Sequence, residues 1–125
     1  MTTSDKVVKF TMLDSALHEL DHEPRKPVHL VLDNIRSAFN VGSAFRTGDA
    51  ARVERIHLGG ISAYPPNSKL EKTALGSTSV VPWNYYPSTY LAIKELKAAG
   101  VAICAVELTN SSVNFWDYEI GRAHV

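Results

Sequence analysis

Cysteine and an excess of either charge are what this sequence of 125 residues most clearly lacks. Cys104 is the single cysteine, so no internal disulfide can form and a reducing compartment is favoured. Thirteen basic side chains balance thirteen acidic ones, so no global field draws nucleic acid or a membrane to the chain. No stretch approaches the roughly 20 apolar residues of a membrane span or forms a secretory signal. We therefore expect a cytoplasmic protein without a membrane partner, in which any anion is bound by a local group of side chains.

The chain has the composition of one globular domain, with 45% hydrophobic and 21% charged side chains. No internal repeat or low-complexity segment divides the chain. The apolar run over residues 99–108 contains Cys104, which we interpret as a core residue. His29 and His57 fall within predicted strands and have no metal-ligand spacing with the cysteine, so they are interpreted as structural and no metal is expected.

Apolar periodicity predicts strands that alternate with helices along the chain. Ser88 is a candidate helix N-cap and Gly100 stands at the position that follows a helix C-cap. Such alternation predicts an α/β domain with a Rossmann-like, mostly parallel sheet and flanking helices. The predicted order is a helix over about 10–22, a strand over 28–34, a helix ending at Ala50, a strand over 52–60, a short helix around 69–75, a short strand ending near Pro82, a helix over 87–99 and a fourth strand over 101–108.

The helix that ends at Ala50 has an unusual polar face. A helical repeat of about 100° per residue places Val41, Ala44, Phe45 and Gly48 on one side. The other side carries amides, hydroxyls and cations in place of the usual Lys and Glu, a composition suited to binding a polar anion. Two readings remain open on spacing alone, a functional face and a solvated face with two chance arginines. The polar residues are Arg36, Asn40, Ser43 and Thr47, with Arg46 flanking them.

Two segments carry a resemblance to a known family. Asn34, Arg36, Ser37, Asn40, Gly42, Arg46 and Thr47 follow a buried strand at fixed spacing, and Lys72, Thr73, Ala74, Gly76, Val81, Pro82 and Trp83 occur later. This pattern resembles the SpoU/TrmH class of the SPOUT RNA methyltransferases, over about residues 27–120. The class methylates a ribose 2′-hydroxyl with S-adenosylmethionine as the donor.

The resemblance implies roles for eight residues. Arg46 corresponds to the catalytic arginine of the motif, and Asn40 to the asparagine that organises the site. The implied substrate-binding residues are Asn34, Arg36, Ser43, Thr47, Lys72 and Thr73. Because a guanidinium is a poor base at neutral pH, we expect Arg46 to act as a fixed cation that stabilises the developing alkoxide and the adjacent phosphate.

The resemblance also implies RNA, either tRNA or rRNA, as the substrate, and a homodimer as the working form. It divides the chain into an N-terminal helical extension over 1–26 and a methyltransferase domain over 27–125. Two later family motifs, which form the knotted pocket for S-adenosylmethionine, are not recognised in the sequence. We therefore expect no cofactor-binding residue in this chain, a domain incomplete at its C-terminus and an inactive isolated chain.

The sequence leaves two alternatives to a methyltransferase. A non-catalytic module for RNA binding or dimerisation, derived from such an enzyme, is the main alternative, and the balanced net charge weakens it. A dinucleotide-dependent oxidoreductase is disfavoured because no G-x-G-x-x-G follows the first strand. Trp83, Tyr85 and Tyr86 either stack on unpaired bases or pack at an interface or beneath the sheet, with packing preferred.

Overall fold

Three parallel strands form the centre of the computed structural model, which describes residues 24–119. The strands are β1 (Lys26–Asp33), β2 (Val53–Gly59) and β3 (Trp83–Tyr86), and their order in the sheet is β1-β2-β3. The predicted fold class, an α/β domain with a parallel sheet and flanking helices, is confirmed. The helix predicted over about 10–22 lies outside the described residues.

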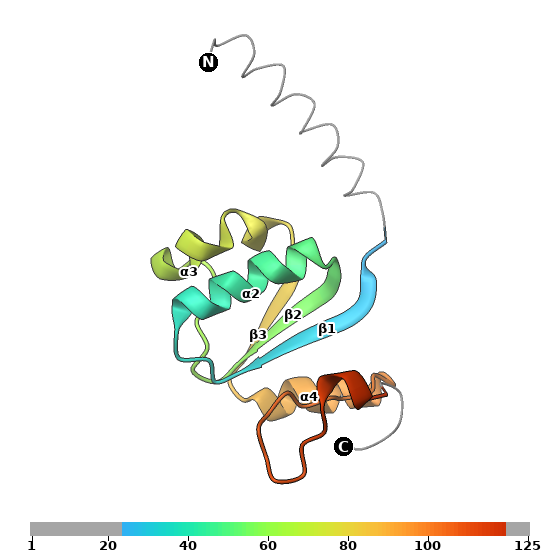
Figure 1. Cartoon of the computed structure of the whole chain (residues 1–125). Coiled ribbons are helices and arrows are strands. Elements are labelled where there is room, and N and C mark those ends of the chain that lie inside the picture. Colours follow the sequence, from blue (N-terminus) through green and yellow to red (C-terminus); the bar gives the residue numbers. More distant parts are fainter. Residues whose placement is uncertain (1–23, 120–125) are drawn as a thin grey trace, which may run out of the picture.

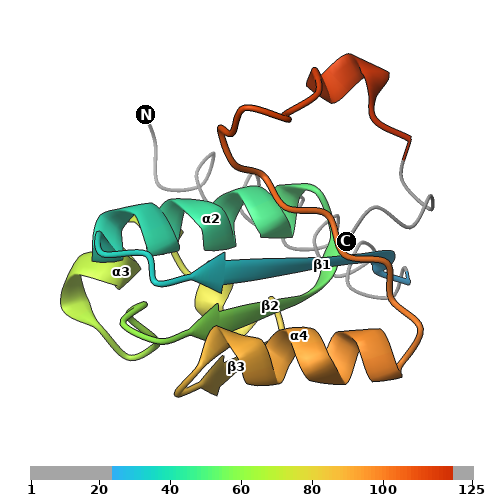
Figure 2. The same cartoon turned by 90° about the horizontal axis from the view of Figure 1, so that it is seen from below.

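Helices cover both faces of this sheet, as Figure 1 and Figure 2 show. The helices α2 (Ala38–Ala50) and α3 (Ser68–Ala74) lie on one face, and α4 (Thr89–Ala98) lies on the other. Two short 3-10 helices, η1 (Ser77–Ser79) and η2 (Phe115–Asp117), complete the described elements. The core fills the space between the sheet, α2 and α3, and consists of Val41, Phe45, Val53, Ile56, Leu58, Leu70, Ala74 and Val81.

The helix α2 begins where the sequence provides a cap. Ser37 has extended backbone angles, and its hydroxyl accepts a hydrogen bond of 3.2 Å from the backbone N–H of Asn40. Val41 and Phe45 are fully buried one turn apart, whereas Ser43 and Thr47 are exposed. The predicted division of this helix into an apolar and a polar side is therefore confirmed.

Gly42 allows α2 and α3 to approach closely. A Cβ atom at this position would overlap the carbonyl oxygen of Leu70 and the hydroxyl of Thr73. The Thr73 hydroxyl also lies 2.7 Å from the carbonyl oxygen of Phe39, to which it donates a hydrogen bond. The glycine thus places the backbone of α3 directly against α2, and this contact brings the polar sides of the two helices together.

The helix α4 ends as its sequence predicts. Gly100 adopts a left-handed φ of 83°, its N–H donates to Lys97, and the N–H of Val101 donates to the carbonyl of Leu96. This pair of bonds is a Schellman C-cap, which favours glycine because the left-handed region is open to it. Ser88 occupies the N-cap position, but its side chain makes no capping hydrogen bond.

Three predictions about the second half of the chain are wrong. β3 begins after Pro82 instead of ending there, because proline lacks an N–H and suits the edge of a strand, where its carbonyl accepts from the N–H of Ile56. Residues 101–108 form no strand, since no neighbouring strand pairs with them in the described structure, and Val106 is fully exposed. Cys104 belongs to this segment and is exposed, so it is not a core residue.

We expect Gly42→Ala to destabilise the fold strongly, because the added methyl meets backbone and a hydrogen-bonded hydroxyl rather than a flexible side chain. Overpacking of this kind costs roughly 1 to 3 kcal/mol or more. The measurement is the urea midpoint of unfolding, with Ser43→Ala as the control at the adjacent exposed position of α2. An unchanged midpoint for Gly42→Ala would mean that α2 and α3 do not pack as described.

Candidate RNA-binding site

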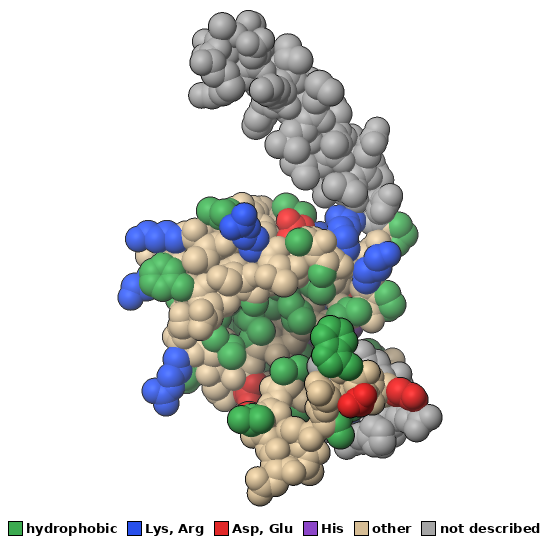
Figure 3. Space-filling model, in the orientation of Figure 1, with side chains coloured by type: hydrophobic (Ala, Val, Ile, Leu, Met, Phe, Trp, Pro, Cys, Tyr) green, Lys and Arg blue, Asp and Glu red, His purple; other side chains and the backbone are tan. Residues whose placement is uncertain are grey.

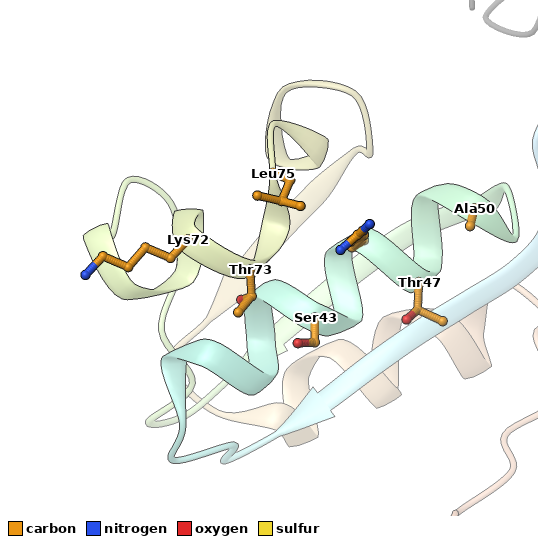
Figure 4. A pocket seen from close by; sticks show the side chains of 7 residues that line it. Ser43, Thr47, Ala50, Lys72, Thr73 and Leu75 are labelled. Carbon is orange, nitrogen blue, oxygen red and sulfur yellow. The ribbon is translucent and has the colours of Figure 1, made fainter.

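An open hollow of about 570 Å³ lies between the exposed sides of α2 and α3. Its residues come from two segments that are about 30 positions apart in the sequence, as Figure 4 shows. The close approach at Gly42 brings these segments together. The residues that line the hollow are Ser43, Arg46, Thr47, Ala50, Lys72, Thr73 and Leu75.

The α2 side of the hollow contributes two hydroxyls and a cation. Ser43, Arg46 and Thr47 are all exposed, and the Arg46 guanidinium makes no hydrogen bond or ion pair within residues 24–119. A guanidinium carries five N–H donors in a rigid fork that suits phosphate. The hollow therefore contains a cation that is available to bind an oxyanion.

The α3 side contributes a second cation and a constrained threonine. Lys72 is exposed in the last turn of α3, and Figure 4 shows its side chain extending outward at the rim of the hollow. Thr73 is half-buried and its hydroxyl proton is engaged with the carbonyl of Phe39, so its oxygen is left as an acceptor. Thr73 therefore holds α3 to α2 as well as lining the hollow.

Three of the eight predicted site residues lie outside the hollow. Asn34 adopts a left-handed φ of 52° directly after β1, and its side-chain oxygen accepts a 3.0 Å hydrogen bond from the N–H of Ile61. Arg36 is exposed in the segment that leads into α2. Asn40 is exposed in the first turn of α2, in line with Ser43 and Thr47 along the helix surface. These residues continue the polar surface from the hollow toward the carboxyl ends of the strands.

The charge of this side of the molecule is positive despite the balanced total. The two stretches that build it, residues 34–50 and 60–75, contain four basic residues and two acidic ones. Figure 3 shows Lys and Arg side chains spread over the part of the molecule that α2 and α3 form. Of the two acidic residues, Glu71 accepts hydrogen bonds of 3.0 Å from the hydroxyl of Thr78. The basic residues are Arg36, Arg46, Lys69 and Lys72.

Ala50 and Leu75 also line the hollow, although neither is among the eight predicted site residues. Ala50 follows Thr47 by one helical turn, so periodicity alone could have indicated it. Leu75 adopts a left-handed φ of 50° as the C-cap of α3 and is 63% exposed, a position that no sequence signal indicates.

A pair of histidines lies on the opposite face of the sheet. His29 Nδ1 is 3.0 Å from His57 Nε2, and His29 Nε2 is 2.6 Å from Glu54 Oε2. Which of the two rings donates at this contact depends on their tautomers. His57 is only 5% exposed, and its Nδ1 has no hydrogen-bond partner among residues 24–119. The pair thus forms a partly buried polar contact between β1 and β2.

Burial lowers the pKa of His57 below its ordinary value, and the nearby His29 and Arg55 lower it further, while Glu95 on α4 acts in the opposite direction. Protonation would create a buried N–H donor without a partner. The neutral ring is therefore the form that the fold stabilises. Within the described residues, no group of three or more His, Cys, Asp or Glu is placed to hold a metal ion.

The aromatic residues of β3 divide between the two faces of the sheet. Trp83 and Tyr85 pack against the core beneath Tyr64, and Tyr85 donates a 2.7 Å hydrogen bond to the carbonyl of Gly60. Tyr86 lies on the α4 side, where its hydroxyl donates to Glu95, and this bond raises the pKa of the phenol. Trp83, Tyr85 and Tyr86 are thus each half-buried in packing contacts.

The described residues thus form an α/β domain with a parallel sheet, and the helices on one face of the sheet present a cationic polar surface. The model of the SpoU rRNA Methylase family matches residues 27–125, so the chain belongs to this family. A similar protein is the 23S rRNA (guanosine-2′-O-)-methyltransferase RlmB of Neisseria meningitidis serogroup B (strain ATCC BAA-335 / MC58), which is 27% identical over 93 residues. That alignment covers 74% of this chain and 37% of the relative, so the chain spans little more than a third of the relative's length.

Solved structures agree with the fold. The SpoU methyltransferase AviRb of Streptomyces viridochromogenes, in complex with the cofactor AdoMet, superposes with a TM-score of 0.54 at 24% identity over 62% of this chain and 30% of that chain. An RNA 2′-O ribose methyltransferase superposes with a TM-score of 0.55 at 18% identity over 65% of this chain and 32% of that one. At these identities the likeness supports the architecture. No helix among residues 24–119 has the length and apolar content needed to cross a membrane.

We expect the stability of the chain to fall as the pH drops below about 6.5, the ordinary pKa of histidine. Because the pKa of His57 is lowered in the folded chain, the unfolded chain binds the proton first as the pH falls. The contribution is complete above the ordinary pKa and is lost as the pH falls toward the folded-state value. Urea unfolding of the wild type and of His57→Gln, whose amide does not titrate, measures this between about pH 7.5 and 5.5. Parallel profiles for the two chains would assign the pH dependence to other groups.

Proposed function

We propose that this chain supplies the RNA-facing surface of a SpoU-class RNA 2′-O-ribose methyltransferase, with the α2–α3 hollow as the site of a backbone phosphate. The observation that carries the proposal is the Arg46 guanidinium, which makes no hydrogen bond or ion pair among residues 24–119 and lines the same hollow as Lys72 and exposed hydroxyls. Family membership makes RNA the anion of first choice, since the similar RlmB enzyme is named for its action on 23S rRNA.

Arg46 would act as a fixed cation. A guanidinium stays protonated in proteins, so it cannot readily take the proton of a ribose hydroxyl. It can stabilise the negative charge that develops on the 2′-oxygen and hold the neighbouring phosphate, and preorganised donors of this kind contribute roughly 3 to 4 kcal/mol to lowering a barrier. We assign Asn40 to orienting the same nucleotide from the first turn of α2, together with Ser43 and Thr47.

The remaining site residues receive supporting roles in this proposal. Arg36 would contact the RNA backbone next to the hollow, because it is exposed before the start of α2. Asn34 would hold the turn that positions Arg36, through its hydrogen bond with Ile61. Thr73 would keep α3 in place and offer its oxygen to the substrate. We also propose that the protein works as a homodimer, as the family resemblance implies.

S-adenosylmethionine is the methyl donor proposed for the class, and AviRb is described with this cofactor bound. The donor supplies the methyl group, and its sulfonium carries a positive charge. Among residues 24–119, those that line the hollow include Arg46 and Lys72 and no carboxylate, so their charge opposes a sulfonium and favours a phosphate. These residues do not fit the donor, and we assign none of them to it.

RNA binding tests the proposal directly. We expect Arg46→Ala and Lys72→Ala each to weaken binding of a fluorescent single-stranded RNA and to reduce the slope of log affinity against log salt by roughly 0.7 to 1. Fluorescence anisotropy over a series of KCl concentrations gives both values. Lys94→Ala is the matched control, because Lys94 is an exposed lysine of α4 on the opposite face of the sheet. Absence of RNA binding by the wild type, or equal losses in all three variants, would refute the proposal.

A second measurement concerns the donor. We expect S-adenosylmethionine, added up to millimolar concentration, to leave RNA bound, because the cationic hollow does not accommodate a sulfonium. Competition is followed by anisotropy, and titration calorimetry compares the heat of S-adenosylmethionine on the wild type and on Arg46→Ala. Displacement of RNA by the donor, or donor heat that depends on Arg46, would place the donor in the hollow instead.

A further inference from the structure

Tyr64 is a large aromatic side chain that the structure leaves half uncovered. It lies in the loop between β2 and α3, and 48% of its surface is exposed. One side of its ring is supported, since the Tyr85 ring centroid is 4.4 Å away and the Trp83 centroid 6.5 Å away in a stacked arrangement. The remaining surface of Tyr64 faces solvent.

The support beneath Tyr64 is fixed in the core. Trp83 and Tyr85 pack against the buried cluster between the sheet and α3, and the Tyr85 hydroxyl is held by the carbonyl of Gly60. Gly60 itself lies against Asn34, the residue that follows β1. The ring of Tyr64 is therefore presented on a packed base, so little conformational freedom is lost when a flat ligand covers it.

Cations continue from this loop toward the hollow. Lys69 is exposed in the first turn of α3, and Lys72 follows one turn later at the hollow. An aromatic platform that is followed along the chain by cations offers the two contacts that single-stranded nucleic acids use, bases stacked on the rings and phosphates on the cations. The charge of this surface thus argues for a nucleic acid rather than for a neutral protein surface.

We propose that Tyr64 stacks on an unpaired base of the RNA whose phosphate occupies the α2–α3 hollow. This inference rests on the proposed function and deepens it, because it makes the substrate an RNA that is single-stranded next to the modified nucleotide. A base buried in a duplex cannot cover the Tyr64 ring, whereas a splayed loop base can.

The test compares two fluorescent octamers, oligoadenylate and a ribose-phosphate octamer without bases. We expect Tyr64→Ala to raise the Kd of the 125-residue chain for oligoadenylate by roughly 5- to 150-fold, the range for loss of one stacked base. Tyr64→Phe keeps the ring and should stay within about twofold of the wild type, and binding of the abasic octamer should not change. Tyr90→Ala is the matched control, because Tyr90 is 68% exposed on α4 at the other face.

Tyr64→Leu gives a second variant that retains apolar packing on Trp83 and Tyr85 but offers no aromatic face. A loss of oligoadenylate affinity in Tyr64→Leu with an unchanged circular dichroism spectrum supports stacking. Unchanged affinity in Tyr64→Ala, or an equal loss of affinity for both octamers, overturns the inference about Tyr64. The proposed function is tested separately by Arg46→Ala and Lys72→Ala, so it can hold when this inference fails. If the wild type does not bind oligoadenylate, both the inference about Tyr64 and the proposed function are refuted. A change from dimer to monomer in Tyr64→Ala, with RNA affinity retained, would identify Tyr64 as a contact between copies.

Discussion

The close contact between α2 and α3 at Gly42 is the constraint on which the candidate site depends. Only a glycine leaves room for the carbonyl of Leu70 at that point, and the hydroxyl of Thr73 closes the contact by donating to Phe39. Arg46 and Lys72 are far apart in sequence, and this packing brings them to one hollow. The same contact buries Val41 and Phe45 against the sheet, so the fold and the site share one structural origin.

A second constraint operates at the carboxyl ends of the strands. Asn34 and Gly60 both adopt left-handed backbone angles, and the side chain of Asn34 connects the end of β1 to the chain that follows β2. On the other face, Asp33 accepts a 2.7 Å hydrogen bond from the hydroxyl of Thr89 at the start of α4. These bonds fix where α2 and α4 begin relative to the sheet. The position of Arg36, and with it the polar surface next to the hollow, follows from this local geometry.

The predictions from sequence are correct where a structure depends on neighbouring residues. They are wrong where it depends on a pairing strand elsewhere in the fold. The polar side of α2 and the Gly100 cap of α4 follow from the order of neighbouring residues, and the structure confirms both predictions. The apolar run over 101–108 has the composition of a strand, yet a strand also needs a neighbour whose backbone pairs with it, and periodicity carries no information about that neighbour. The same reasoning explains Cys104, because a residue in an unpaired run has no sheet to pack against. The start of β3 after Pro82 could have been predicted, since proline is found more readily just before a strand than inside one.

The chain has a total formal charge of zero, yet the surface around the hollow carries more basic than acidic residues. Net charge and fixed local charges have different effects on binding. A large net charge would attract any polyanion at long range, whereas a few fixed cations next to hydroxyls act only on an anion of the right shape at short range. In the proposed site the position of Arg46, which α2 and the Gly42 contact determine, would contribute more to recognition than the number of basic residues does. The aromatic surface of Tyr64 adds a requirement that no cation can impose, because it distinguishes an exposed base from the phosphates that every RNA has in common.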